Sequence, residues 1–382
     1  MVFARFKLPI VTGQILAGML VGPYVLGWVV DQTVIAEISS VGIVLLLFII
    51  GLETDPLELR RLANRIKLLV ILEVGVSFAF GFEAASVLGL NFVLSIIFAM
   101  AVSISSTAIV GKIIMERRMF RSEESKVLVG LLVIEDIVAV GFLIFLSTIT
   151  QRNFVSPSQQ LLQIILTGVG GVVLLVAGYI IARFLAPYAI DYLSGYETEF
   201  EEIPFLFALA LGLTFAVVAA VLGYSPGIGA FIIGLSIRGK QSRFLFEKLT
   251  PLKDLFLVMF FVSMGSLINP FPALAIGFPV LLVMALIVAG KFLGGMVVGW
   301  SLQRDGTEGR ALPLSFGAWL VPRGEFSLII GQFALTVGLI DTNLFSLVGL
   351  SVLVTAIVGP LLHRFFAPRL AEAVHLVRPE TD

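Results

Sequence analysis

Long runs of apolar residues follow one another along almost the entire chain. A helix that crosses a lipid bilayer needs about 20 such residues, and on this rule the sequence contains about twelve segments. They lie near residues 8–29, 33–51, 66–89, 92–115, 125–148, 160–185, 203–222, 225–238, 251–268, 272–301, 310–337 and 343–366. Hydrophobic residues make up 58% of the chain and charged residues 13%, whereas a soluble domain is about 45–50% apolar and about 25% charged. We therefore predict an all-α polytopic membrane protein with about twelve transmembrane helices.

The apolar segments leave little sequence for anything else. Residues 1–370 are predicted to form a single transmembrane unit, followed by a short cytoplasmic tail at 371–382. The segment at 225–238 is short and rich in glycine and proline, so we expect it to be tilted or packed inside protein. Residues 2–6, VFARF, are typical of the end of a preceding helix, which leaves open whether a further span precedes Met1.

Positively charged residues predict the orientation. Cytoplasmic loops of membrane proteins carry an excess of lysine and arginine. With the N-terminus placed inside, nearly all of the 25 lysine and arginine residues fall in loops on that side. Arg152 falls in an outer loop, and Lys291 and Arg323 fall within segments. We therefore predict a multi-pass protein of the cell membrane, with both ends of this chain in the cytoplasm.

The remaining composition excludes several kinds of site. The chain has no cysteine, so disulfide bonds and thiolate metal sites are excluded. Its two histidines, His363 and His375, are expected to lie in the C-terminal tail, so a histidine metal site in the middle of the membrane is excluded. We expect no enzyme activity, no cofactor and no nucleic-acid partner, and we expect membrane lipid as the surroundings.

Two adjacent acidic residues interrupt one of the most apolar stretches, 131–146 (LLVIEDIVAVGFLIFL). A single charge at the centre of a bilayer costs about 2.5–3.5 kcal/mol on insertion scales, so Glu135 and Asp136 require a partner or a function. Neighbours on a helix point about 100° apart, and the two carboxylates therefore cannot face the same partner. Lys291 is the natural partner of Glu135, whereas no second mid-span lysine is available to neutralise Asp136. The pair of Glu135 and Lys291 is either a structural bridge or part of a functional site.

Two segments contain residues that disfavour a continuous helix. In 99–112 (AMAVSISSTAIVGK), hydroxyl side chains compete for backbone hydrogen bonds. In 317–328 (GAWLVPRGEFSL), a proline removes an amide donor and a glycine loosens the helix. Irregular backbone at this depth occurs only inside protein or along a cavity. In secondary transporters, interrupted segments in corresponding halves mark the substrate site, so we predict inverted repeats with two discontinuous helices.

The hydroxyl side chains of the first interrupted segment have two interpretations. Ser105, Ser106 and Thr107 are either packing groups or ligands, because hard cations prefer oxygen ligands. In the second interpretation they complete a shell around a sodium or potassium ion that Asp136 binds.

Three further charged residues are interpreted mainly as compensating groups. Arg323 and Glu325 either balance the partial charges of the half-helix ends or contact the ion directly. Glu73 lies about a turn and a half into its helix, where we expect it to snorkel, to cap or to compensate charge.

The chain resembles a known family along nearly its whole length. The matching stretches, in the family's order, are GQILAGMLVGP (13–23), GIVLLLFIIGLETDP (42–56), SSTAIV (105–110), ED (135–136), PGIGAFIIGL (226–235), FFVSMG (260–265), GKFLGG (290–295) and PRGEFSLI (322–329). The chain is therefore similar to the second monovalent cation:proton antiporter family. These sodium/hydrogen exchangers are related to the glutathione-gated potassium efflux proteins, whose membrane domain this chain resembles.

The resemblance implies a fold and a set of roles. Members have a core domain with two crossing, unwound helices, here about 66–148 and 272–366, and a dimerisation domain, here about 8–51 and 160–268. They work as homodimers and exchange sodium or potassium for protons by an elevator-like movement of the core. In this chain the resemblance implies that Asp136 binds the ion or the proton and that Lys291 can bridge to Glu135.

Two features depart from the family pattern. The acidic pair is Glu-Asp, where many sodium-type relatives have Asp-Asp and efflux types have Gln-Asp, and this leaves the coupling ratio open. The chain also ends soon after its last helix, so a nucleotide-binding regulatory domain is not expected.

The predicted function is secondary active antiport of sodium or potassium against protons by alternating access. A bound cation favours the ionised form of a carboxylate, so proton and cation compete for Asp136. Competition gives obligatory exchange if the empty charged site cannot cross the membrane. A gated monovalent cation channel and an organic-anion symporter of the same architecture are the alternatives, and a structural or sensor role is a third. The sequence does not determine whether the transported cation is sodium or potassium.

Overall fold

The computed structural model of the chain describes residues 10–29, 31–54, 64–116, 123–150, 203–237, 240–303 and 311–375, with single helical positions between 169 and 184. All elements in these ranges are helices, and the prediction of an all-α fold is confirmed. The expected segment at 160–185 lies largely outside the described residues, as do residues 1–9 and 376–382.

The helices form two compact units. The first unit comprises Met1–Val30, Arg61–Ala139 and Met264–Asp382, and the second comprises Asp31–Arg60 and Val140–Ser263. Each unit is built from stretches that are distant in sequence. An apolar helix buries its surface against other helices, and these need not be its neighbours along the chain.

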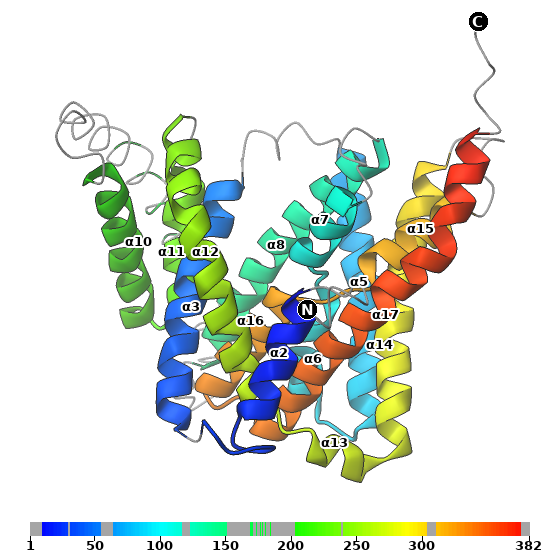
Figure 1. Cartoon of the computed structure of the whole chain (residues 1–382), viewed down its shortest axis with the longest axis horizontal. Helices are drawn as coiled ribbons and strands as arrows, with labels where there is room; N and C mark the ends of the chain where they lie inside the picture. The colour runs from blue at the N-terminus through cyan, green and yellow to red at the C-terminus, as the bar shows by residue number, and fades with distance from the viewer. Residues whose placement is uncertain are drawn as a thin grey trace, which may run out of the picture. The chain divides into compact units, whose positions relative to one another are not determined.

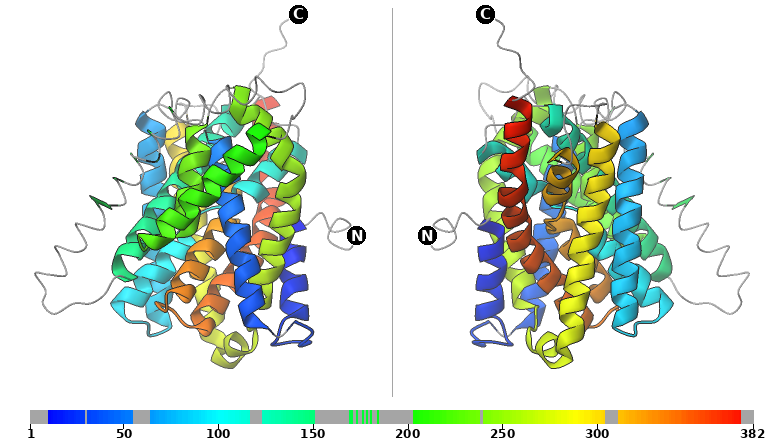
Figure 2. Two further views of the ribbon diagram at one scale, coloured as in Figure 1. Left: turned by 90° about the vertical axis from the view of Figure 1, so that its left-hand side faces the viewer. Right: turned by 90° about the vertical axis from the view of Figure 1, so that its right-hand side faces the viewer.

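The first unit contains most of the helices. They are α2 (Ile10–Val21), α5 (Asn64–Val87), α6 (Phe92–Ser103), α7 (Thr107–Glu116), the first part of α8 (Glu123–Thr150), α13 (Phe271–Ile276), α14 (Phe278–Leu302), α15 (Ala311–Leu320), α16 (Glu325–Thr336) and α17 (Thr342–His375). Helices α5 and α14 pack along one another, and α15 packs against both α14 and α17 (Figures 1 and 2). Gly295 permits the contact of α14 with α15, because a Cβ atom there would lie 2.5 Å from the carbonyl oxygen of Phe316. Small residues of this kind let helices approach closely in membranes.

The second unit is organised around α11 (Pro226–Ser236). This helix packs against α3 (Gln32–Glu53) and α10 (Ile203–Val221), and nearly all of its side chains are buried. The apolar core of this unit includes Phe48, Ile49, Ala216, Ile233 and Leu245. The expectation that the short segment at 225–238 lies inside protein is confirmed.

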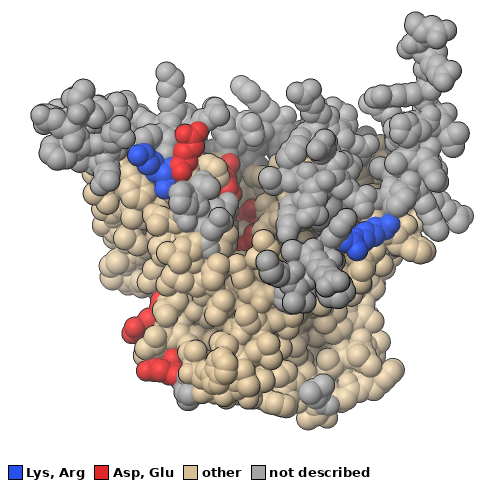
Figure 3. Space-filling model, in the orientation of Figure 1, with Lys and Arg blue, Asp and Glu red and all other residues tan. Residues whose placement is uncertain are grey.

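The described surface has the character of a membrane protein. Six helical stretches among the described residues are long and apolar enough to cross a membrane, namely Thr33–Glu53, Ile66–Val87, Phe92–Gly111 (which includes the end of α6 and the start of α7), Val127–Ile149, Phe278–Leu302 and Thr342–Phe366. Large apolar side chains such as Trp28, Val221 and Phe278 are exposed, and most described atoms on the face in Figure 3 are neither acidic nor basic. Exposed apolar side chains of this kind are suited to contact with a membrane or with another protein.

Two helices extend beyond their expected ends. Helix α12 (Lys240–Ser266) begins before the expected segment at 251–268, and α17 continues to His375 rather than ending near residue 366. Hydropathy detects the apolar part of a helix, whereas backbone hydrogen bonding continues through polar residues that favour helix. The placement of His363 in the C-terminal tail is wrong: it lies in the apolar part of α17, buried with its ring centroid 4.0 Å from that of Trp319.

Candidate ion site at the two helix breaks

The two predicted helix breaks are present, and they meet in the first unit. The first break separates α6 from α7 and the second separates α15 from α16. The amide of Ser106 donates to the carbonyl oxygen of Pro322 over 2.8 Å. The guanidinium of Arg323 donates through Nε to the carbonyl oxygen of Val102. These bonds join the two unwound stretches, so backbone groups freed by one break are satisfied at the other.

The C-terminal ends of the broken helices converge on Arg323, which is fully buried. Besides Val102 at the end of α6, its guanidinium donates to the carbonyl oxygens of Val321 over 3.3 Å and of Ile287 over 3.0 Å. A helix C-terminus carries a partial negative charge, which a cation stabilises. Arg323 therefore lies where it compensates the ends of α6 and α15.

The N-terminal ends of α7 and α16 meet an acidic side chain. Glu325 lies in the first turn of α16, and the hydroxyl of Ser106 donates to its Oε2 over 3.3 Å. The same hydroxyl accepts from the amide of Ile109 over 3.2 Å, so Ser106 also caps α7. Anionic groups are stabilised at helix N-termini.

Glu135 is held from two directions. The amide of Ser105 donates to its Oε2 over 2.6 Å, and the hydroxyl of Ser105 lies 3.2 Å from its Oε1. The ammonium of Lys291 on α14 lies 3.0 Å from Oε2. The structure thus brings together Glu135 and Lys291, the pair considered from the sequence. Both side chains are almost completely buried.

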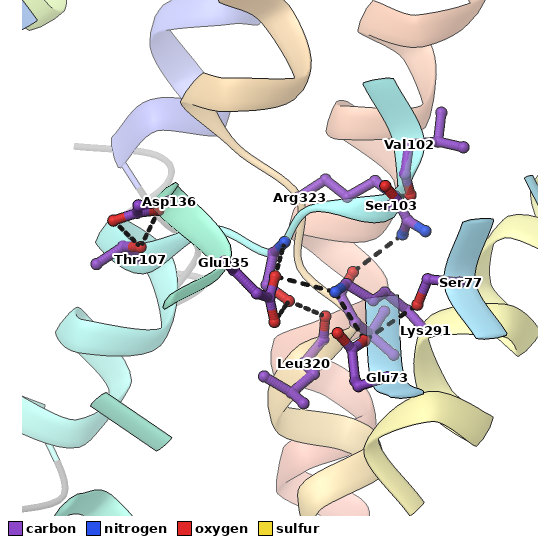
Figure 4. Close-up of polar contacts among 12 residues, drawn as sticks. Glu73, Ser77, Val102, Ser103, Thr107, Glu135, Asp136, Lys291, Leu320 and Arg323 are labelled. Atoms are coloured by element: carbon purple, nitrogen blue, oxygen red, sulfur yellow. Dashed lines mark hydrogen bonds and ion pairs between the residues drawn. The ribbon is translucent and has the colours of Figure 1, made fainter. Parts of the chain in front are cut away.

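Glu73 on α5 is a second carboxylate that forms an ion pair with Lys291 (Figure 4). Its Oε1 lies 2.7 Å from Nζ of Lys291 and accepts from the hydroxyl of Ser77 over 3.0 Å. Glu73 is fully buried, so it neither snorkels nor caps its helix, and two of the three roles expected from the sequence are wrong. The reason is that Lys291 supplies a charge partner inside the protein.

Asp136 projects from α8 in a different direction from Glu135, as expected for helical neighbours (Figure 4). The hydroxyl of Thr107, the first residue of α7, lies 3.1 Å from its Oδ1 and 3.3 Å from its Oδ2. Asp136 is only 5% exposed. A carboxylate and a hydroxyl at the start of a half-helix are suitable oxygen ligands for a small cation.

The three hydroxyls of the first break face three different carboxylates. Thr107 faces Asp136, Ser105 faces Glu135 and Ser106 faces Glu325. The interpretation in which all three surround one ion at Asp136 therefore does not match this arrangement. The three residues lie where the chain leaves α6 and enters α7: Ser105 follows the extended C-cap Ile104 of α6, Ser106 caps α7, and Thr107 is the first residue of α7.

Sequence reasoning missed two contributors to the site. Ser77, four residues after Glu73, could have been found from the helical spacing of contacting side chains. Thr355, whose Oγ1 accepts from the amide of Arg323 over 3.2 Å, gives no signal in the sequence. Among the described residues, no group of three or more histidine, aspartate or glutamate side chains could hold a metal ion. A cation bound at Asp136 would be a transported substrate rather than a resident cofactor.

A helical membrane protein whose two interrupted helices meet beside buried carboxylates has the architecture of a secondary transporter. The family model described as "Sodium/hydrogen exchanger, transmembrane" matches residues 1–367. The chain therefore belongs to the sodium/hydrogen exchanger family, an integral membrane transporter family, and the resemblance inferred from its motifs is confirmed.

Individual relatives agree with this assignment. The chain is 29% identical over 365 residues to the K(+)/H(+) antiporter subunit KhtU of Bacillus subtilis (strain 168), covering 94% of this chain and 87% of KhtU. It is 28% identical over 367 residues to the Na(+)/H(+)-K(+) antiporter GerN of Bacillus cereus, covering 93% of this chain and 89% of GerN. The fold is similar to that of the sodium proton antiporter MjNhaP1 from Methanocaldococcus jannaschii, with a TM-score of 0.69, 17% identity, and coverage of 97% of this chain and 94% of MjNhaP1.

Proposed function

We propose that this protein is a secondary active antiporter that exchanges sodium or potassium for protons by alternating access. The observation that carries the proposal is the contact of Asp136 with Thr107 at the start of α7. It places a buried carboxylate beside a hydroxyl and a half-helix, inside a family of sodium/hydrogen exchangers. The names of KhtU and GerN support both potassium and sodium as candidate cations.

Exchange follows from competition at one carboxylate. Asp136 binds either a proton or a cation, because a bound cation favours its ionised form. An ionised and empty site is expensive to move through a low-dielectric region. The site therefore changes its exposure only when it is loaded with one or the other, and this couples the two fluxes.

Two parts of the chain have separate roles in this proposal. The first unit carries every residue of the site, and we assign it the movement that exposes Asp136 to either side. Following the family resemblance, we assign the role of scaffold and homodimer contact to about 8–51 and 160–268. These bounds differ from those of the second unit, because α2 belongs to the first unit and residues 140–150 belong to the second. We further propose the cell membrane as the location, with both ends of this chain cytoplasmic, from the distribution of lysine and arginine.

The test is exchange in proteoliposomes with a trapped pH-sensitive dye. After a pH gradient is imposed, addition of sodium, potassium or lithium should dissipate the gradient in a saturable manner, while empty liposomes show no response. Movement of labelled cation that ignores an imposed proton gradient would contradict antiport and favour a channel. A response to organic anions and not to cations would favour the symporter alternative.

A further inference from the structure

The ammonium of Lys291 lies between two carboxylates, Glu135 on α8 and Glu73 on α5, whose other partners differ. Glu135 is tied to the first helix break through both the amide and the hydroxyl of Ser105. Glu73 instead lies on α5, a continuous helix, and is oriented by Ser77 one turn further along. Lys291 thus links Glu135, which contacts the first helix break through Ser105, to Glu73, which is oriented within α5.

The contact with Glu73 is built into the packing of α5 against α14. A Cβ atom at Gly294 would lie 2.9 Å from the carbonyl oxygen of Glu73 and 3.2 Å from its Oε1. Glycine at this position therefore permits the close approach that sets Lys291, one turn earlier on α14, against Glu73. When the helix break rearranges, the packing of α5 and α14 favours Lys291 staying with Glu73.

One carboxylate oxygen of Glu73 accepts no hydrogen bond from the described residues. Its Oε1 receives both Lys291 and Ser77, whereas its buried Oε2 has no hydrogen-bond partner among the described residues. A buried carboxylate oxygen without a donor is costly. An ammonium has three donors, so Lys291 could bind both oxygens of Glu73 once it no longer contacts Glu135.

The other charged groups of the site, Arg323, Asp136 and Glu325, have contacts of their own elsewhere in the described residues. Arg323 is a cation whose guanidinium donates to three carbonyl oxygens. Asp136 faces Thr107, and Glu325 faces Ser106 at the N-termini of the half-helices. Without Glu73, departure of Lys291 from Glu135 would leave an unpaired buried charge, which is strongly unfavourable.

We propose that Glu73 is an alternate docking carboxylate for Lys291, so that the ammonium can leave Glu135 during transport without losing an anionic partner. Glu73 is in this view a positioning residue that acts through Lys291. The inference rests on the proposed antiport function, because it assigns a step of that cycle.

The test compares exchange rates per folded molecule in proteoliposomes for four proteins: wild type, Glu73→Gln, Lys291→Gln and the double variant. Glu73→Gln should lower the maximal rate about tenfold to a hundredfold, the range for loss of a hydrogen bond to a charged group, with little change in the half-saturating cation concentration. In the Lys291→Gln protein, adding Glu73→Gln should change the rate by less than about twofold, because the partner of Glu73 is already absent. Glu83→Gln, an exposed acid on the same helix, is the control and should behave as wild type.

Two results would overturn the inference. One is a Glu73→Gln protein whose maximal rate equals that of wild type. The other is a Glu73→Gln substitution that lowers the maximal rate by the same factor in wild type and in the Lys291→Gln protein. If either of those variants fails to fold, Ser77→Ala removes one donor from Glu73, and it should lower the maximal rate about threefold without changing cation affinity. A maximal rate for Ser77→Ala equal to that of wild type would also overturn it. Failure of the proposed function itself is distinguishable, because wild type would then show no cation-dependent proton movement.

Discussion

The hydroxyl of Thr107 lies 3.1 Å from Oδ1 and 3.3 Å from Oδ2 of Asp136, so one side chain of the first helix break faces both oxygens of the acid. Thr107 is also the first residue of α7. Any rearrangement of the break therefore changes the surroundings of Asp136 directly. Glu135, the preceding residue of α8, is held by Ser105 and Lys291 instead. The structure in this way separates the two adjacent acids into different environments.

Removing the Thr107 hydroxyl is expected to weaken cation binding. Thr107→Val keeps the shape of the side chain but removes the oxygen that faces Asp136. The half-saturating cation concentration should rise about twofold to tenfold, the effect of one hydrogen bond. Initial exchange rates over a range of cation concentrations measure it. Thr107→Ser retains the hydroxyl and serves as control, and equal affinities of Thr107→Val and wild type would exclude Thr107 as a ligand.

Cation affinity is expected to depend on pH through competition at Asp136. As the pH falls, protons occupy the carboxylate and the cation must displace them, so the half-saturating cation concentration rises. Full competition gives an increase of up to about tenfold per pH unit. The measurement is the rate of exchange at several cation concentrations and several pH values. A half-saturating concentration that is constant with pH, with only the maximal rate changing, would indicate separate sites.

The sequence predicted the fold better than it predicted the surroundings of individual side chains. Hydropathy located most of the described helices, although the expected segment 272–301 is divided at Gly277 into α13 and α14, and α2 ends at Val21 rather than near residue 29. Pro322 and the run of hydroxyls located both breaks, because these effects act within a short stretch of chain. The placement of Glu73 depends instead on Lys291, 218 residues further along. No local pattern could distinguish a buried ion pair from a snorkelling acid. The directions of Ser105 and Ser106 likewise depend on where α6 ends and α7 begins, which the run of hydroxyls alone does not fix.

Arg323 is expected to be essential for stability. Arg323→Gln cannot donate to the three carbonyl oxygens that the guanidinium reaches. The variant should lose about 2 kcal/mol or more, the cost of leaving at least one buried acceptor without a donor. The midpoint of thermal unfolding in detergent should fall accordingly. Arg364→Gln, at an exposed position of α17, is the matched control, and equal midpoints for the two variants would contradict the role given to Arg323.

The crossing of the two breaks is expected to require glycine at position 324. A Cβ atom there would lie 2.6 Å from Cβ of Ser106. Gly324→Ala should therefore force the breaks apart and cost about 1–3 kcal/mol, as overpacking does. Gly75→Ala is the control, because Gly75 lies in a continuous helix with no atom within 4 Å of an added Cβ. The midpoint of thermal unfolding should fall for Gly324→Ala and stay at the wild-type value for Gly75→Ala. A lower midpoint for Gly75→Ala than for Gly324→Ala would contradict this account of the crossing.

The central claim is that Asp136 carries the exchanged ion or proton. Its most direct test is cation-dependent proton movement by Asp136→Asn in proteoliposomes, beside wild type and Glu83→Gln, with equal amounts of folded protein confirmed by gel filtration. An amide can neither take up the proton nor supply the negative charge that binds the cation. We predict that wild type and Glu83→Gln exchange at equal rates while Asp136→Asn falls to the background of empty liposomes. Exchange by Asp136→Asn at the wild-type rate would contradict the claim.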